Sequence, residues 1–267
     1  MAERLHAKTP GRWSGTSPIS FVVLVAVAAI MIASMHQVAP SPKQLADGLP
    51  GMVSLVNRMM PPNMDPAFMA RVFWRIVETF QIALVGAAIG ILLSLPIGWL
   101  AARGVTPLGR GGYLVKAIIS LLRTIPDLVW ALLFVATVGL GAVAGTMTII
   151  VDTIGFCGRF FAEAIEDAEK EPQEALSAIG ANRVSVLTGA ILPAVAPSMI
   201  NTSLFALEKA VRSSVVLGLV GAGGIGQELK VAFDLFQYQN ASSIILSIFV
   251  IVLVMEWITD HLRARLQ

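Results

Sequence analysis

The sequence predicts an all-α membrane protein with six transmembrane helices, and two observations support this prediction. Hydrophobic residues make up 56% of the 267 residues and charged residues only 13%, whereas a soluble domain carries about 25% charged residues. Six stretches are also mostly apolar over about 20 residues, the length that a helix needs to cross the hydrocarbon core. In chain order these stretches are residues 18–36, 77–102, 114–138, 143–162, 187–217 and 242–258.

The first stretch, 18–36, follows a short tail, 1–17, that contains basic residues. A basic segment before an apolar run is also typical of a secretory signal peptide. The run here is longer than a usual signal sequence, and no convincing cleavage site follows it. We therefore predict a retained membrane anchor, whose removal would leave five spans.

The segment 37–74 is too polar and too rich in proline to span a membrane. Within it, LPGMVSLVNRMM places Met52, Leu55, Val56 and Met59 on one helical face. The segment is therefore predicted to be an extracytoplasmic loop whose amphipathic pieces lie at the outer membrane interface. A binding role is the alternative to simple packing.

The third and fourth stretches are separated only by GLGAVAG, which predicts a tight turn between them. Pro126 lies inside the third stretch, where a proline frees a backbone carbonyl and can kink the helix. The fifth stretch is long and carries polar residues, and the sixth is SSIILSIFVIVLVMEWI.

The orientation follows from the Lys and Arg residues near the span ends, which favour the cytoplasm. Placing the N-terminus inside gives most of these residues to cytoplasmic segments, so both termini are predicted to be cytoplasmic, with 261–267 as the C-terminal tail. The cytoplasmic set is Arg4, Lys8, Arg12, Arg103, Arg110, Arg159, Lys170, Arg183, Arg263 and Arg265.

A polar insert at 163–193 separates the fourth and fifth spans on the predicted cytoplasmic side. Pro172 suits the first turn of a short helix, and Gly180 suits its left-handed end. Leu176 and Ile179 would give this helix an apolar side that could dock into another protein. An ordinary solvated connector fits the same pattern equally well.

Ionisable residues at membrane depth are costly and are default functional candidates. The fifth span holds Glu208, Lys209, Arg212 and Ser213, and Glu208 and Arg212 are spaced to share a helix face. Arg212, with Ser213 or Lys209, is a candidate lining for a translocation path, because a guanidinium can donate two parallel hydrogen bonds to the oxygens of an anion. The alternative is that Glu208 and Arg212 merely neutralise each other.

Two further charged sites lie in the spans. Arg123 and Asp127 form a second pair four residues apart, although Arg123 could instead reach the cytoplasmic interface. Asp152 has no local partner, so it requires a cation from another helix or water.

The composition excludes several classes of site. Cys157 is the single cysteine and the three histidines are scattered, so neither a disulfide framework nor a metal site is expected. The net charge of +2, without a basic patch, argues against nucleic acid as a partner. No Walker A sequence occurs, so this chain is not expected to bind ATP or to be an enzyme.

The stretch GLVGAGGIGQELK, 218–230, contains the spacing of a dinucleotide-binding fingerprint. A predicted transmembrane helix precedes it instead of a strand, and no acidic residue lies about 20 residues beyond it to bind a ribose. We therefore interpret Gly221, Gly223, Gly224 and Gly226 as positions of close backbone approach at the end of the fifth span.

The insert also carries a recognisable motif. EALSAIGANRVSVLTGAILPAV resembles the EAA motif of bacterial ABC importer permeases, which reads E-A-A, three residues, G, nine residues and I-x-L-P. Leu176 replaces the second alanine and Ala190 the isoleucine. The resemblance implies that the insert is a coupling helix seated in a groove of a cytoplasmic ATPase. The residues that it assigns to this role are Glu174, Ala175, Leu176, Gly180, Leu192 and Pro193.

Stretches such as LRTIPDLVWALLFVATVGLGAVAG and FALEKAVRSSVVLGLVGAGGIG resemble the permease subunit of phosphonate ABC importers. This resemblance implies a type I permease domain over 75–260 in a bacterial inner membrane, forming a homodimer. It also implies that Gly221, Gly223, Gly224 and Gly226 lie in a gate or in a contact between two copies of the chain. The implied partners are two ATPase subunits, which would bind ATP and Mg²⁺, and an extracytoplasmic substrate-binding protein. The implied substrates are phosphonate, phosphite and phosphate, and the resemblance does not rank them.

Two other functions stay open on the residues alone. An ion-gradient-driven secondary transporter for a small anion would use Asp152 or Glu208 as coupling groups, but such proteins usually carry inverted repeats and none is visible. A membrane oxidoreductase would use the glycine-rich stretch to bind a dinucleotide.

Overall fold

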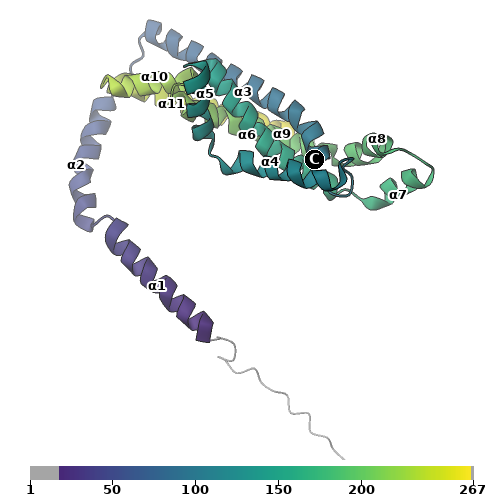
Figure 1. The fold of residues 1–267 in the computed structure, drawn as a ribbon. Helices are drawn as coiled ribbons and strands as arrows, with labels where there is room; N and C mark the ends of the chain where they lie inside the picture. The colour runs from purple at the N-terminus through teal and green to yellow at the C-terminus, as the bar shows by residue number, and fades with distance from the viewer. Residues whose placement is uncertain (1–17, 266–267) are drawn as a thin grey trace, which may run out of the picture. The chain divides into compact units, whose positions relative to one another are not determined.

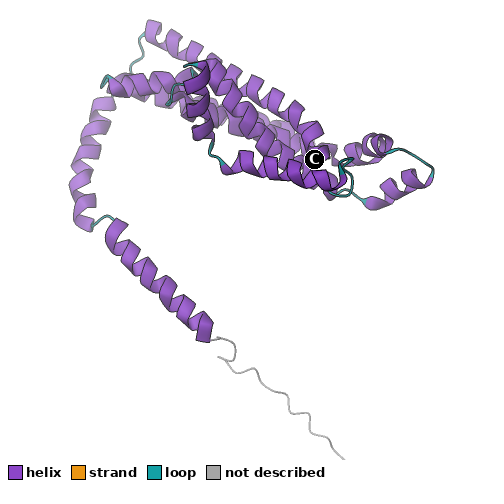
Figure 2. Cartoon of the chain, viewed as in Figure 1, coloured by secondary structure: helices purple, strands orange, loops and turns teal. Residues whose placement is uncertain are grey.

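The computed structural model describes residues 18–265, and these residues form helices and loops without a strand (Figure 2). The helices in chain order are α1 (Pro18–Val38), α2 (Pro42–Met59), α3 (Pro66–Ala101), η1 (Gly109–Gly111), α4 (Gly112–Thr124), α5 (Asp127–Val138), α6 (Ala142–Glu166), α7 (Lys170–Ala178), α8 (Arg183–Val186), η2 (Leu187–Ile191), α9 (Leu192–Gly218), α10 (Gly224–Asp234) and α11 (Tyr238–Ala264). The predicted all-α class is confirmed. The expected tail 1–17 lies outside the described residues.

The chain divides into two compact units, Met1–Asn57 and Arg58–Gln267. In the first unit, α1 matches the predicted span 18–36 and its apolar side chains are exposed, for example Phe21 and Leu24 at 63% and 67%. A helix that is apolar on all sides is suited to lipid. The first unit also holds most of α2, an amphipathic helix within the predicted extracytoplasmic loop.

The helical bundle begins earlier than predicted. Residues 66–74 were expected in the loop 37–74, but they form the first turns of α3. Asp65 caps this helix by accepting a hydrogen bond from the Phe68 backbone N–H at 3.1 Å, and Pro66 suits the first helical position. Phe68 and Val72 are buried against α10 and α11, so this extension is part of the core.

The α3–α6 contact lies at the centre of the second unit, and α6 also touches α4, α5 and α9 (Figure 1). Glycines on α3 make this approach close. A Cβ on Gly86 would lie 2.7 Å from the Ile149 Cβ, and one on Gly90 would lie 2.5 Å from the Thr153 Cβ. Small residues permit such backbone proximity in membrane helices.

The predicted third span is broken in two. α4 and α5 meet at Ile125–Pro126 with a bend of 87°, instead of forming one helix over 114–138. Ile125 takes an extended conformation because the residue before a proline is disfavoured in the helical region, and Pro126 has no N–H to continue the helix. The expected kink is therefore present but sharp.

Four helical segments, Ile19–Val38, Pro66–Ala101, Arg183–Gly218 and Tyr238–Ala264, are long and apolar enough to cross a membrane, and the bent pair α4–α5 brings the number to five. The predicted span 143–162 is present as α6, a single helix of 25 residues. It carries four charged residues, Asp152, Arg159, Glu163 and Glu166, and is not among these segments. The total of six spans and the orientation of the termini stay predictions.

The C-terminal elements also depart from the expected boundaries. α11 runs from Tyr238 to Ala264, so it continues past the predicted span 242–258 into the expected tail 261–267. α10 was not predicted, because its sequence GIGQELKVAFD begins with glycines that argue against a helix. It packs on α3, α9 and α11.

The α3–α6 contact yields a stability prediction. Gly90→Ala is expected to lower the free energy of unfolding by about 1–3 kcal/mol, because the added methyl group would overlap Thr153. Thermal unfolding of the purified chain in detergent would measure the loss. Gly51→Ala is the matched control, since nothing lies within 4 Å of the added atom. Equal midpoints for the two variants would contradict close packing at Gly90.

Candidate functional site

The predicted coupling insert forms a helix, a glycine turn and a second helix. α7 and α8 project beyond one end of the bundle (Figure 1). α7 ends in a Schellman motif, in which the Ala181 N–H donates to the Leu176 carbonyl at 3.1 Å and the Gly180 N–H to the Ser177 carbonyl at 3.0 Å. Gly180 has a φ of +87°, which confirms its predicted left-handed role as the helix end.

Leu176 on α7 and Ile179 at its end lie in different surroundings, one packed on the bundle and one exposed. Leu176 packs against the buried cluster that contains Val186, Leu187 and Ile191. Ile179 is 81% exposed. The expectation that Leu176 and Ile179 share one docking face is therefore wrong, because Leu176 holds α7 on its own bundle. Glu174, Ala175 and Ile179 form the exposed surface of the insert.

The return from the insert runs directly into α9. Asn182 caps α8 by accepting from the Ser185 N–H at 2.8 Å. A π-helical turn, Leu187–Ile191, follows, and Leu192 and Pro193 open α9. Pro193 has no N–H for the regular helical bond, which is a physical reason for the wider turn before it. Leu192 is half-buried and Pro193 exposed, so the two assigned residues form the base of the insert.

A cavity of about 660 Å³ separates α7 from the loop after α3. Its lining mixes both charges, including Arg103, Glu166, Lys170 and Glu174. Glu166 ties the start of the insert to α4 through Lys116, whose Nζ lies 2.6 Å from the carboxylate. The insert is thus attached at its two ends and along the Leu176 side.

The charged residues of the fifth span are paired across helices. Lys209 Nζ lies 2.8 Å from Asp152 Oδ1 on α6 and 5.2 Å from the Phe156 ring centroid. The cross-helix cation that Asp152 required is therefore Lys209. This pairing balances the charge of Lys209. The role of Lys209 in lining a path stays a prediction.

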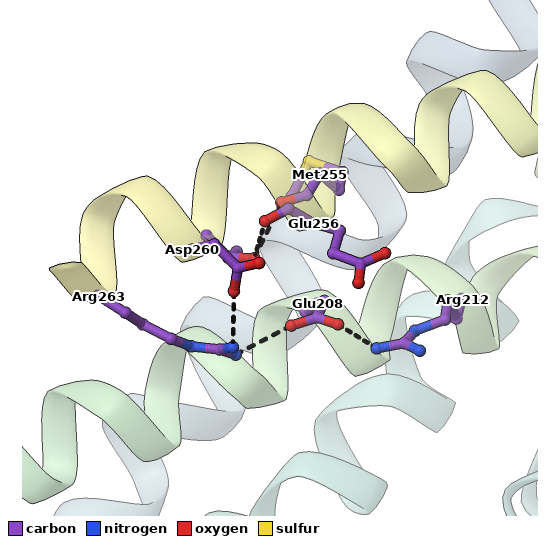
Figure 3. Close-up of polar contacts among 7 residues, drawn as sticks. Glu208, Arg212, Met255, Glu256, Asp260 and Arg263 are labelled. Carbon is purple, nitrogen blue, oxygen red and sulfur yellow. Dashed lines mark hydrogen bonds and ion pairs between the residues drawn. The ribbon is translucent and has the colours of Figure 1, made fainter.

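Glu208 forms ion pairs with two arginines, as Figure 3 shows. Arg212, one turn along α9, and Arg263 on α11 both donate to its carboxylate, the latter at 2.9 Å. Arg263 also donates to Asp260 at 3.2 Å. The predicted Glu208–Arg212 pair is confirmed, and the cluster as a whole is electrically balanced. The sequence analysis missed this role of Arg263, because the residue was assigned to the tail 261–267. Met255, Thr259 and Arg263 are spaced four residues apart, and this helical spacing could have indicated that the last helix continues.

The predicted pair of Arg123 and Asp127 is not formed. The bend at Pro126 separates the two side chains: Asp127 accepts a hydrogen bond from Ser213 Oγ at 3.1 Å, and the Arg123 guanidinium lies 5.8 Å from the Phe160 ring centroid. Ser213 therefore ties α9 to α5. Among the candidate path residues, Arg123 and Arg212 are both exposed, the latter with 52% of its side chain accessible.

The glycine-rich stretch is buried within one chain. Gly221, Gly223 and Gly224 have φ values of +93°, +86° and +71°, so the turn between α9 and α10 requires glycine. Gly221 accepts a hydrogen bond from the Gly141 N–H at 2.9 Å, and a Cβ on Gly226 would lie 1.9 Å from the Val215 carbonyl oxygen. Close backbone approach is confirmed inside the chain. A role of these glycines in a gate or in a contact between two copies stays a prediction.

Cys157 is a free, buried thiol. Among the described residues, 18–265, no group of three His, Cys, Asp or Glu side chains could hold a metal ion.

Comparison with known proteins agrees with this arrangement. Residues 94–267 match the family described as the binding-protein-dependent transport system inner membrane component. The phosphite transport system permease protein PtxC of Stutzerimonas stutzeri is 35% identical over 82% of this chain and 79% of its own length. The phosphate-import permease protein PhnE of Mycolicibacterium smegmatis is 38% identical over 80% of this chain, which spans only 40% of that relative.

A solved structure shows the same fold. The MetNI methionine ABC transporter, in an inward-facing conformation, contains a chain that aligns over 76% of this chain and 100% of its own length. The TM-score is 0.64 at 23% identity. With more than half of its residues matched by the family, the chain belongs to the inner membrane components of binding-protein-dependent ABC transport systems.

Proposed function

We propose that this chain is the membrane-spanning permease subunit of an ATP-driven importer for phosphonate or a related phosphorus oxyanion, phosphite or phosphate. The observation that best supports this proposal is the helix α7, which projects from the end of the bundle with Ala175 and Ile179 exposed. The chain that carries it belongs to the permease family. A homodimer would form the translocation pathway. The same end of each chain would then present one α7 to each of two ATPase subunits.

The coupling role follows from how α7 is held. α7 follows α6 in the chain and packs through Leu176 on α8 and η2, which continue into α9, so a displacement of α7 would be passed to α6 and α9. ATP and Mg²⁺ would be bound by the partner subunits. Glu174, Ala175 and Ile179 would contact the ATPase, and Gly180, Leu192 and Pro193 would set the angle of the insert.

The substrate class rests on the names of the relatives. Permease proteins for phosphite and phosphate are 35% and 38% identical to this chain. A separate extracytoplasmic binding protein would select the molecule, since tight binding inside the membrane would trap it. Arg212 is the candidate contact within the path, because its partly exposed guanidinium suits a phosphoryl group. Ser213, Glu208, Lys209 and Arg123 would position the helices around that path.

The secondary transporter is less well supported. Its coupling acids would be Asp152 and Glu208, and both are neutralised by fixed cations, Lys209 for the first and Arg212 with Arg263 for the second. A proton-coupling or sodium-coupling carboxylate must instead be free to lose its partner. The paired state favours a structural role for these acids.

The coupling loop can be tested at its cap. Gly180→Val is expected to reduce substrate-stimulated ATPase activity severalfold in the complex reconstituted with its ATPase and binding protein. A β-branched residue with a left-handed φ costs about 1–2 kcal/mol and would reorient the end of α7. Gly104→Val is the matched control, because Gly104 also has a positive φ, +80°, and open space around it. Full stimulation in an assembled Gly180→Val complex would overturn the coupling role.

The Ile179 surface provides a test of assembly. Ile179→Ser is expected to reduce co-purification of the ATPase subunit, since an exposed apolar anchor is lost, while the permease itself stays folded. Val184→Ser is the control, because Val184 lies on the same insert and is 54% exposed. If the two variants retain the ATPase equally, α7 is not the contact.

Neutralising the Asp152–Lys209 pair distinguishes an ATP-driven importer from an ion-gradient-driven transporter. Asp152→Asn is expected to destabilise the chain by roughly 1–3 kcal/mol, because it leaves Lys209 without a carboxylate. Adding Lys209→Met is expected to recover stability and ATP-dependent uptake of phosphonate, phosphite or phosphate by vesicles. Uptake that needs no ATP and disappears in the double variant would instead support the secondary transporter.

A further inference from the structure

Three arginines line one pocket at the end of the bundle that carries α7. Arg103 and Arg110 come from the segment between α3 and α4, and Arg183 comes from α8. The pocket has a volume of about 340 Å³. Its remaining lining includes Tyr113 and Thr106 and contains no acidic residue.

The three guanidinium groups are not neutralised by carboxylates within residues 18–265. Arg183 Nη1 donates to the Thr106 carbonyl at 3.2 Å, and Arg103 lies 5.2 Å from the Tyr113 ring centroid. Two other cations at this end are paired with carboxylates, Lys116 with Glu166 and Arg159 with Glu163, each at 2.6 Å. The pocket therefore brings together three arginines whose charge is not balanced in this way.

The backbone around the pocket is well ordered by its own contacts. Thr106 is 7% exposed; its hydroxyl donates to the Leu100 carbonyl at 2.8 Å and accepts from the Leu108 N–H at 3.2 Å. A Cβ on Gly112 would lie 3.1 Å from that same carbonyl oxygen, so α4 starts close against the end of α3. The arginines are thus presented by a folded loop.

Apolar side chains extend outward from the pocket along α4. Leu114 and Ile118 lie one turn apart and are 67% and 51% exposed, and Leu108 is 48% exposed. Tyr113, at the pocket, is 59% exposed, and tyrosine is typical of the membrane–water boundary. A ligand that joins an anionic head to a hydrocarbon chain would match both the arginines and this face.

We propose that the Arg103–Arg110–Arg183 pocket binds the phosphate group of an anionic phospholipid, with the acyl chains along Leu108, Leu114 and Ile118. Basic pockets between membrane helices are suited to such head groups, and arginine donates paired hydrogen bonds to phosphate oxygens. Free phosphate would use the same donors but would leave the apolar face uncovered. The proposal does not depend on which molecule is transported.

The test uses the purified full chain in detergent, titrated with fluorescently labelled phosphatidylglycerol. Arg110→Gln is expected to weaken binding about fivefold and the Arg103→Gln/Arg110→Gln double variant about twenty-fivefold, as roughly 1 kcal/mol per basic residue near an anionic surface implies. Arg110 is the primary variant, because its side chain makes no hydrogen bond or ion pair with the other described residues. Its replacement therefore breaks no such contact. Arg159→Gln, which removes a charge already paired with Glu163, should bind as the unmodified chain does.

Competition identifies the source of the phosphate group. Displacement by unlabelled phosphatidylglycerol, but not by phosphatidylcholine or inorganic phosphate, supports the proposal. Displacement by inorganic phosphate at equal concentration supports a phosphate site and overturns the lipid assignment. Equal binding of phosphatidylcholine, or unchanged affinity in both glutamine variants with unaltered unfolding temperatures, overturns the site.

Discussion

The close contact between α3 and α6 is the constraint on which the rest of the bundle depends. Gly86, Gly90 and Gly98 let the two helices approach until a single methyl group would collide with Ile149, Thr153 or Phe161. Helix association in a bilayer gains little from the hydrophobic effect, so such packing supplies much of the attraction. With α6 fixed at the centre, α4, α5 and α9 pack around it.

The same arrangement determines where charge can be buried. α9 lies against α6 and α11, so Lys209 meets Asp152 on one side and Glu208 meets Arg263 on the other. A buried ion pair needs partners for each of its charges, and removal of one member costs more than the pair contributes. These pairs therefore specify which face of α9 turns toward each neighbour, and they leave Arg212 as its accessible cation.

The elements that depend on local chemistry were predictable from the sequence, and those that depend on helix neighbours were not. The left-handed end at Gly180 and the interruption at Pro126 follow from single residues whose backbone preferences are strong. Asp152 could be predicted to need a cation, but the identity of Lys209 depends on the α6–α9 contact. The pair of Arg123 and Asp127 was wrong because helical spacing holds only where the helix continues. Leu176 was assigned to a partner because nothing in an amphipathic pattern distinguishes a face that meets another protein from one that meets the same chain.

The position of Arg263 has a consequence for handling the protein. The residues after 258 look like an expendable end, yet Arg263 supplies half of the positive charge around Glu208. A truncation at 260, or a fusion partner that unwinds the last turns of α11, would remove that cation and leave Glu208 with Arg212 alone. Expression work should therefore treat the end of α11 as part of the transport core and place an affinity tag after a flexible spacer.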